Sequence, residues 1–170
     1  QRQRKANDAK GTRNSFYCVR EQAFTSSFPP TDKALNEPDG LLAIGGKLDV
    51  KNLLEAYKLG IFPWYSEENP VMWWSPKIRP VIRPHEIRIS KSLKKTIKKN
   101  TFDLSYDKCF KRIMQNCSTS GDRAGKSWIT STMIEAYTEL HALGHAHSVE
   151  CWQNGELCGG LYGVSVGRIF

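Results

Sequence analysis

The chain lacks the signatures of several common protein classes. Its 170 residues hold no apolar run long enough to cross a bilayer. Residues 1–22 are polar and basic, and no apolar stretch of the secretory type follows them. The glycine-rich loops that bind nucleotide phosphates and the paired histidines of zinc enzymes are also missing. We therefore expect a protein without a membrane segment, a metal or another cofactor.

The cysteines do not form a recognisable pattern. Their number is odd, no C-x-x-C occurs, and they stand at Cys18, Cys109, Cys117, Cys151 and Cys158. Neither a disulfide framework nor a zinc site is indicated, so reduced thiols in the cytoplasm fit best. His145 and His147 would share a strand face without a third ligand, which favours structural roles for both.

Positive charge is unevenly distributed. The net charge is +8, and residues 77–99 alone contribute nine basic side chains against the single acid Glu86. Residues 1–20 hold six basic side chains and one acidic side chain. Such concentration suits a polyanion, either nucleic acid or an anionic membrane. For the patch at 77–99, a solvated basic surface is an equally good interpretation.

The first half of the chain mixes disorder with short elements. Residues 1–22 contain few large apolar groups, which predicts a disordered tail. An apolar run at 41–46 predicts a buried strand that ends in a glycine turn. Asp49 then has the position of a helix cap, and Gly60 ends that helix.

The middle of the chain is rich in proline and lysine. Residues 81–82 and 87–89 have the composition of short strands. Ser90 is placed to cap a helix over 91–99, in which Leu93 and Ile97 share one face.

The second half predicts an α+β domain. The pattern indicates a helix over 106–117 and another helix headed by a capping box of Thr132 and Glu135. Asn154 and Gly155 are a strong hairpin signal between two strands. A hairpin alone cannot bury its face, so we expect further strands beyond Phe170 and a chain that is incomplete at its C-terminal end.

Several motifs stand in an order that resembles one family. They are GLLAIGG at 40–46, AY at 56–57, GIFPW at 60–64, WWSP at 73–76, WIT at 128–130, EAY at 135–137, LGHAHS at 143–148 and GGLYGV at 159–164. From about Phe28 to Phe170, the chain resembles the bacterial leucyl/phenylalanyl-tRNA–protein transferases. Residues 1–22 show no such resemblance.

The resemblance implies a fold and an activity. It implies a small N-terminal α+β domain over 23–77, after the tail at 1–22, and the first part of a GNAT-like (acetyltransferase-fold) domain over 78–170. It further implies transfer of Leu or Phe, and less readily Met, from aminoacyl-tRNA to proteins whose first residue is Arg or Lys. Such marking leads to degradation by the N-end rule. A cytoplasmic monomer without a cofactor is expected.

The resemblance also assigns residues. Tyr57, Trp64 and Trp128 should flank the terminal adenosine of tRNA, and Leu161 and Phe170 should line the pocket for the aminoacyl side chain. The tRNA backbone should meet the basic helix through Lys91, Lys95, Lys98 and Lys99. No catalytic residue is assigned within this chain, because the family's catalytic polar groups are expected after Phe170; this piece alone should be inactive.

Two other functions compete with this interpretation. One is a GNAT-type N-acetyltransferase, which should carry a pyrophosphate loop at the start of a helix. The other is a non-catalytic RNA-binding module that uses only the lysines and the tryptophans. The indoles of Trp64 and Trp128 suit base stacking, which contributes roughly 1–3 kcal/mol per base.

Overall fold

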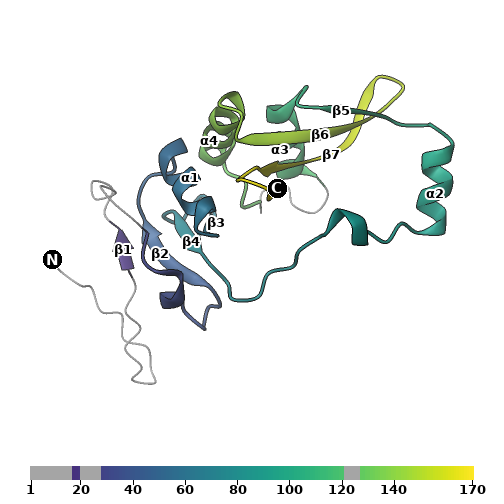
Figure 1. Ribbon diagram of the computed structural model, residues 1–170. Coiled ribbons are helices and arrows are strands. Elements are labelled where there is room, and N and C mark those ends of the chain that lie inside the picture. The colour runs from purple at the N-terminus through teal and green to yellow at the C-terminus, as the bar shows by residue number, and fades with distance from the viewer. Residues whose placement is uncertain (1–16, 20–27, 121–126) are drawn as a thin grey trace. The chain divides into compact units, whose positions relative to one another are not determined.

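The computed structural model describes residues 17–19, 28–120 and 127–170, and its architecture is α+β, as predicted (Figure 1). The chain divides into two compact units, residues 1–77 and residues 78–170. Each unit has its own sheet and its own buried core. Among the described helices, none is long and apolar enough to span a membrane.

The first unit is built around a small mixed sheet. Its elements are β1 (Tyr17–Val19), the 3-10 turn η1 (Thr31–Lys33), β2 (Leu41–Gly45), α1 (Val50–Lys58), β3 (Phe62–Pro63) and β4 (Met72–Trp74). The strand order is β1-β2-β4-β3, with β1 parallel to β2 and the other pairs antiparallel. Strand β1 lies within the predicted disordered tail, where composition gave no sign of the pairing that β2 provides. The remainder of that tail lies outside the described residues.

Helix α1 forms as its sequence predicts. The Asp49 side chain accepts a hydrogen bond from the Asn52 amide at 2.9 Å, which satisfies one of the free N–H groups at the helix start. Gly60 follows the helix with a φ of +73°, a conformation that glycine adopts without steric cost. Leu53 and Ala56, on the inner face of the helix, are fully buried. The predicted strand at 41–46 is likewise confirmed as β2.

Trp73 is the centre of this unit's core. Its side chain is completely buried, and its indole Nε1 donates to the Gly45 carbonyl at 2.9 Å. The Phe28 ring meets it edge-on, with 4.8 Å between the ring centroids. A buried indole needs a hydrogen-bond acceptor, and Gly45, the last residue of β2, supplies one.

The second unit places two helices on an antiparallel sheet. Its elements are the 3-10 turn η2 (Pro84–Glu86), α2 (Lys91–Lys98), β5 (Asp103–Tyr106), α3 (Phe110–Thr119), α4 (Ser131–Ala142), β6 (Ala146–Gln153) and β7 (Glu156–Val164). The strand order is β5-β6-β7, antiparallel throughout. Helices α3 and α4 cover one face of this sheet (Figure 1).

The two short strands predicted before α2 do not exist. Residues 81–82 and 87–89 are exposed and belong to no strand, and a 3-10 turn at Pro84–Glu86 lies between them. Pro80 and Pro84 have no amide hydrogen to donate, and no strand among the described residues pairs with this segment. The prediction of α2 is confirmed, and the Ser90 hydroxyl accepts from the Leu93 amide at 3.1 Å.

Two helix starts also differ from the prediction. Of the helix predicted over 106–117, Tyr106 belongs to β5, residues 107–109 form a bend, and α3 starts only at Phe110. Tyr106 pairs with Val149 of β6, so the first residue of the predicted helix is extended. Helix α4 is capped by Thr130, whose hydroxyl accepts from the Met133 amide at 3.2 Å, and not by Thr132. The T-x-x-E spacing at Thr132 and Glu135 therefore falls inside the first turns of the helix.

The hairpin between β6 and β7 is confirmed. Asn154 and Gly155 have φ values of 52° and 80°, as a two-residue turn with positive φ at both positions requires. The register pairs Trp152 with Leu157 and shifts between Cys151 and Trp152. Beyond the shift, pairing runs without interruption from Cys151 with Gly159 to Ala146 with Val164.

Candidate functional site

Trp64 has a fixed backbone and an exposed side chain. Its amide donates to the Met72 carbonyl at 3.0 Å, and its carbonyl accepts from Trp74 Nε1 at 2.6 Å. The Trp64 side chain is nevertheless 50% exposed, with its ring tilted against that of Trp74 at a centroid distance of 5.6 Å. A rigid backbone with a free indole face is suited to stacking on a flat ligand.

Tyr57 belongs to the same unit as Trp64. It lies near the end of α1 and is half-buried. The turn after it is held by the Ile61 amide, which donates to the Ala56 carbonyl at 2.8 Å. Helix α1 packs on β3, the strand that leads directly to Trp64.

Trp128 has a comparable setting in the second unit. It is 39% exposed and directly precedes Ile129 and Thr130, both of which are buried. The Trp128 carbonyl accepts from the Thr130 amide at 3.1 Å, and the Ile129 amide donates to Ser127 Oγ at 3.1 Å. The cap of α4 thus anchors the backbone beside an exposed indole. Trp64 and Trp128 belong to different units, so their common role around an adenosine stays a prediction.

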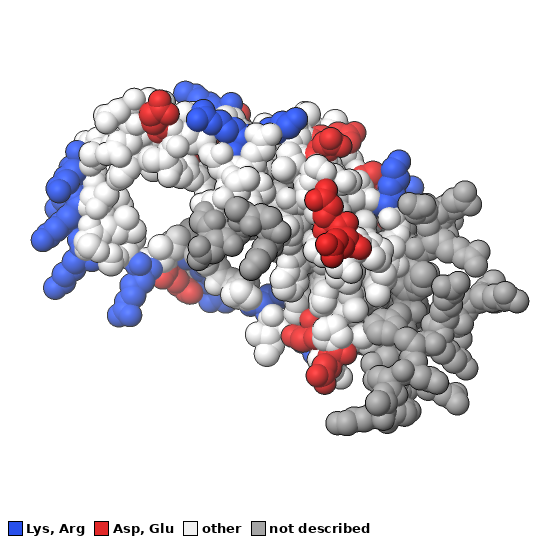
Figure 2. All heavy atoms as spheres, turned by 180° about the vertical axis from the view of Figure 1, so that it is seen from behind, with Lys and Arg blue, Asp and Glu red and all other residues white. Residues whose placement is uncertain are grey.

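Helix α2 presents an unusually uniform charge. Each of its lysines is exposed, and together with the cap residue they are Lys91, Lys94, Lys95, Lys98 and Lys99. In Figure 2, blue side chains project outward from α2. No acidic residue occurs in the helix, so these cations have no local partner along it. Upstream, Glu86 pairs with Arg83 at 3.2 Å. A helix of this kind is suited to contacting phosphates.

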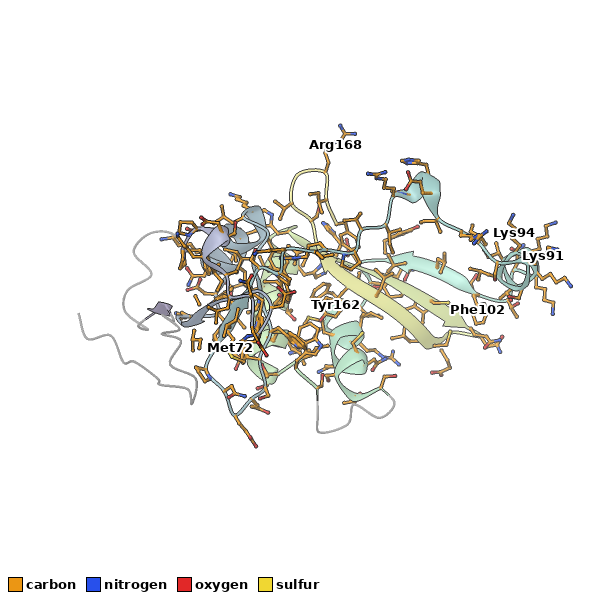
Figure 3. The ribbon with its side chains drawn as sticks, turned by 90° about the horizontal axis from the view of Figure 1, so that it is seen from below. Met72, Lys91, Lys94, Phe102, Tyr162 and Arg168 are labelled. Atoms are coloured by element: carbon orange, nitrogen blue, oxygen red, sulfur yellow. The ribbon has the colours of Figure 1, made fainter. Side chains whose placement is uncertain are left out.

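Leu161 and Phe170 lie on the sheet face opposite the helices. Tyr162 contacts the rings of Phe110 in α3 and Tyr137 in α4, at centroid distances of 6.0 Å and 6.3 Å. Figure 3 shows Tyr162 between β7 and the helices. Because side chains alternate along a strand, Leu161 points to the other face, where it is 51% exposed. Phe170 is 60% exposed.

Sequence reasoning missed a buried carboxylate at the centre of the sheet. Glu150 is completely buried and accepts from Ser105 Oγ at 2.5 Å and from Ser148 Oγ at 2.6 Å. Trp152 Nε1 donates in turn to Ser105 Oγ at 2.8 Å. Burial alone would raise the pKa of Glu150, but these hydrogen bonds and those from the amides of Cys109 and Lys108 outweigh it and lower the pKa.

The role of this carboxylate is to hold the start of α3. Cys109 is the residue at the head of α3, and its amide donates to Glu150 Oε1 at 3.4 Å. Cys109 provides no side-chain cap of its own. Glu150 therefore supplies the negative charge and the acceptor that a helix N-terminus favours. Only the folding of β6 against β5 brings these groups together, since they are 41 residues apart.

A second cluster that sequence reasoning missed surrounds Asp107. Its carboxylate accepts from the Ser148 amide at 2.8 Å and lies 2.8 Å from His147 Nδ1 and 3.8 Å from His141 Nδ1. Burial would raise the pKa of Asp107, yet the bonds from His147 and Ser148 lower it. His147, for which we predicted a structural role, thus contacts the Asp107 carboxylate. Within the described residues, no group of three or more His, Cys, Asp or Glu side chains could hold a metal ion.

Comparison with known proteins identifies a family. The family profile for leucyl/phenylalanyl-tRNA protein transferase matches residues 81–170, and the profile for the N-terminal domain of the same transferase matches residues 46–77. A leucyl/phenylalanyl-tRNA–protein transferase of Legionella pneumophila (strain Lens) is 53% identical over 148 residues, which are 87% of this chain and 66% of the relative.

Two further relatives agree with this match. The transferase of Azotobacter vinelandii is 49% identical over 144 residues, covering 85% of this chain and 64% of its own. That of Pseudomonas paraeruginosa is 50% identical over 143 residues, covering 84% of this chain and 63% of its own. The chain therefore spans slightly less than two thirds of the length of these relatives.

Proposed function

The chain belongs to the leucyl/phenylalanyl-tRNA–protein transferase family, and from this premise we propose that it binds the aminoacyl end of a charged tRNA for transfer of the amino acid to a protein. The observation that carries the proposal is the exposure of two indoles. Trp64 and Trp128 are 50% and 39% exposed although their backbones are anchored, whereas Trp73 is completely buried. Large aromatic side chains left exposed on ordered backbone are typical of ligand contacts.

In this proposal Trp64, Trp128 and Tyr57 flank the terminal adenosine of the tRNA. The two indoles would provide stacking surfaces, which contribute roughly 1–3 kcal/mol for a base. Leu161 and Phe170 would contact the side chain of the bound amino acid. An apolar surface favours Leu, Phe and Met over polar side chains, because a polar side chain finds no hydrogen-bond partner there.

Helix α2 would contact the tRNA backbone. Lys91, Lys95, Lys98 and Lys99 are exposed, and their charge is not neutralised along the helix. Contacts of this kind position a nucleic acid without reading its sequence. They would therefore serve tRNAs with different anticodons equally well, and the aminoacyl group would decide which tRNA is used.

The chemistry demands little of the protein. An aminoacyl ester is already activated, and the α-amino group of an acceptor has a pKa of about 7.7–8.0, so much of it is neutral at working pH. Holding the amine against the ester carbonyl then supplies much of the acceleration. We assign no general base to this chain.

The wider setting follows from the family and is part of the same proposal. The acceptors would be proteins with N-terminal Arg or Lys, marked in this way for N-end-rule degradation in the cytoplasm. We propose residues 23–77 as a small N-terminal domain and residues 78–170 as the first part of a GNAT-like domain. The order β5-α3-α4-β6-β7, with both helices on one face, supports the second assignment.

Binding of charged and uncharged tRNA tests the proposal. The probe is tRNA that carries Phe through a hydrolysis-resistant amide linkage, compared with the same tRNA without an amino acid. We expect the charged form to bind more tightly, and Trp64→Ala or Trp128→Ala to weaken its binding by about tenfold each, with little change in thermal unfolding. Leu143→Ala, which removes another exposed apolar side chain at the end of α4, is the control and should change neither the binding of charged tRNA nor thermal unfolding.

The same assay separates the competing functions. Equal binding of charged and uncharged tRNA would indicate an RNA-binding module and contradict the proposal. Stabilisation against thermal unfolding by acetyl-CoA would favour an N-acetyltransferase instead. Normal binding by both tryptophan variants would remove the stacking role.

The role of α2 is tested by salt. Replacing Lys95, Lys98 and Lys99 with Ala should reduce the slope of log K against log salt by about 2–3, since each phosphate contact contributes about 0.7–0.9. The matched control removes three other exposed lysines, Lys47, Lys51 and Lys58, and should leave the slope nearly unchanged. Equal slopes for both triple variants would exclude α2 from the tRNA contact.

A further inference from the structure

We propose that Gly163 determines the selectivity among aminoacyl side chains, because it allows the ring of Phe170 to lie directly on β7 beside Leu161. The inference rests on the proposed function, in which Leu161 and Phe170 contact the bound amino acid. Gly163 itself would touch no substrate. It acts as a positioning residue, because it leaves the space that the Phe170 ring occupies.

The three residues share one face of the sheet. Tyr162 points toward α3 and α4, so its neighbours Leu161 and Gly163 point to the opposite face. Gly163 pairs with His147 and Leu161 pairs with Val149 in the register of β6 and β7. Leu161 and Gly163 are therefore successive residues on the face that the helices leave open.

A tight turn brings Phe170 back to this face. The amide of Val166 donates to the carbonyl of Ile169 at 2.9 Å, and the amide of Ile169 donates to the carbonyl of Val166 at 3.1 Å. Gly167 takes a φ of +61° within the turn, which a residue with a side chain rarely adopts. Figure 3 shows Arg168 projecting from its tip. The reversal directs the residue after Ile169 toward the strand that the chain has just left.

The Phe170 ring occupies the space of a missing side chain. A Cβ atom at Gly163 would lie 2.8 Å from Cζ, 3.0 Å from Cε2 and 3.2 Å from Cε1 of Phe170. Ordinary contacts between carbon atoms are about 3.5–4.0 Å. Any residue other than glycine would therefore push the ring away from the strand. The φ of Gly163 lies outside the left-handed region, so the need for glycine here arises from this contact and not from the backbone.

Neighbouring glycines on β7 show that this contact is specific. Gly159 lies on the same face as Gly163, and a Cβ there would meet only Cys151 Cβ, at an ordinary 3.8 Å. Gly160 points the other way, and its added Cβ would approach Ile113 of α3 and the Val149 carbonyl. Of these three glycines on β7, Gly163 alone is in contact with a residue assigned to the amino acid.

The consequence is a change of selectivity. An alanine at position 163 would push the Phe170 ring off the strand by roughly 0.5–1 Å, because its Cβ would otherwise lie 2.8 Å from Cζ. A bound phenylalanyl ring is larger and less adaptable than a leucyl side chain, so it should lose more affinity. Small changes of shape in an apolar site alter binding by factors of about 10–200.

The test compares Gly163→Ala with Gly159→Ala in the chain as it stands. The probes are tRNAs that carry Leu or Phe through a hydrolysis-resistant amide linkage, together with uncharged tRNA. We expect Gly163→Ala to weaken binding of the Phe form by about tenfold and of the Leu form by less than about threefold. Binding of uncharged tRNA should not change. Gly159→Ala should preserve the wild-type ratio of Phe to Leu affinity.

A second pair of variants shows whether the effect passes through Phe170. In a Phe170→Ala background the ring is absent, so Gly163→Ala should then cause no further change in the Phe to Leu ratio. An equal effect in both backgrounds would overturn the proposal, because it would place the action of Gly163 elsewhere. Such non-additivity would not result from a general loss of stability.

The outcomes separate this inference from the function on which it rests. If wild-type chain prefers charged tRNA but Gly163→Ala keeps the wild-type Phe to Leu ratio, the inference is wrong and the proposed function stands. If wild-type chain binds charged and uncharged tRNA equally, the proposed function fails and the inference fails with it. A shifted ratio that depends on Phe170 supports both.

Discussion

The two faces of the sheet formed by β5, β6 and β7 are built on opposite principles. The face under α3 and α4 is closed: Ser148 and Glu150 are buried there, and every polar group of the network around Glu150 has a partner. The other face carries Leu104, Leu161 and Phe170, which are 63%, 51% and 60% exposed. Polar atoms are thus enclosed on one side, and apolar side chains are presented on the other.

The helix face of the sheet serves stability, and the open face is available for recognition of a ligand. A buried, fully bonded polar network is costly to disturb, because each unsatisfied group loses its contact with water without compensation. Exposed apolar groups contribute little to folding but are available to a ligand. We therefore expect substitutions on the helix face to change the free energy of unfolding and those on the open face to change binding.

The largest effect is expected from Glu150→Ala. The change would leave two serine hydroxyls and the Cys109 amide without their acceptor, and it should lower the free energy of unfolding by about 3 kcal/mol. Urea denaturation measures it. Glu139→Ala, at an exposed position on α4, is the control and should stay within about 0.5 kcal/mol of wild type. Equal stability of the two variants would refute a structural role for the buried network.

A smaller effect is expected from Gly160→Ala. Its new Cβ would lie 2.8 Å from the Val149 carbonyl oxygen and against Ile113, so it should destabilise the chain by about 1–3 kcal/mol through overpacking. Gly159→Ala, one residue away on the open face, meets only an ordinary contact and should change stability by less than about 1 kcal/mol. Similar unfolding midpoints for both variants would contradict the distinction between the faces.

The free energy of unfolding should fall gradually as the pH is lowered into the acid range. The pKa values of Glu150 and Asp107 are lowered in the fold, so the unfolded chain binds their protons first as the pH falls. Their stabilisation is complete above the unfolded values of 4.5 and 3.8 and is lost as the pH falls through the lower folded values. Urea denaturation between pH 7 and pH 3 should show this loss. Glu150→Gln should make the free energy of unfolding depend less on pH. An unchanged pH dependence would show that Glu150 is not a source of the acid-induced loss.

Local elements were largely predictable from the residues. Asp49 and Ser90 cap their helices as expected, and Asn154 with Gly155 makes the hairpin turn, because caps and tight turns depend on residues within three or four positions of each other. The predictions that failed needed distant partners. Tyr106, the first residue of a predicted helix, belongs instead to β5, because Val149 of β6, some forty residues later, pairs with it.

By itself the amino-acid sequence determined the α+β class, the basic helix, the hairpin and the ordered motifs of the family. Only the tertiary structure decided that Glu150 is enclosed among Ser105, Ser148 and the start of α3, and that Phe170 lies against Gly163. Periodicity reports which side of an element is apolar. It does not report which distant atoms fill the space beside it, since that depends on strand register and on the turns that bring separate segments together.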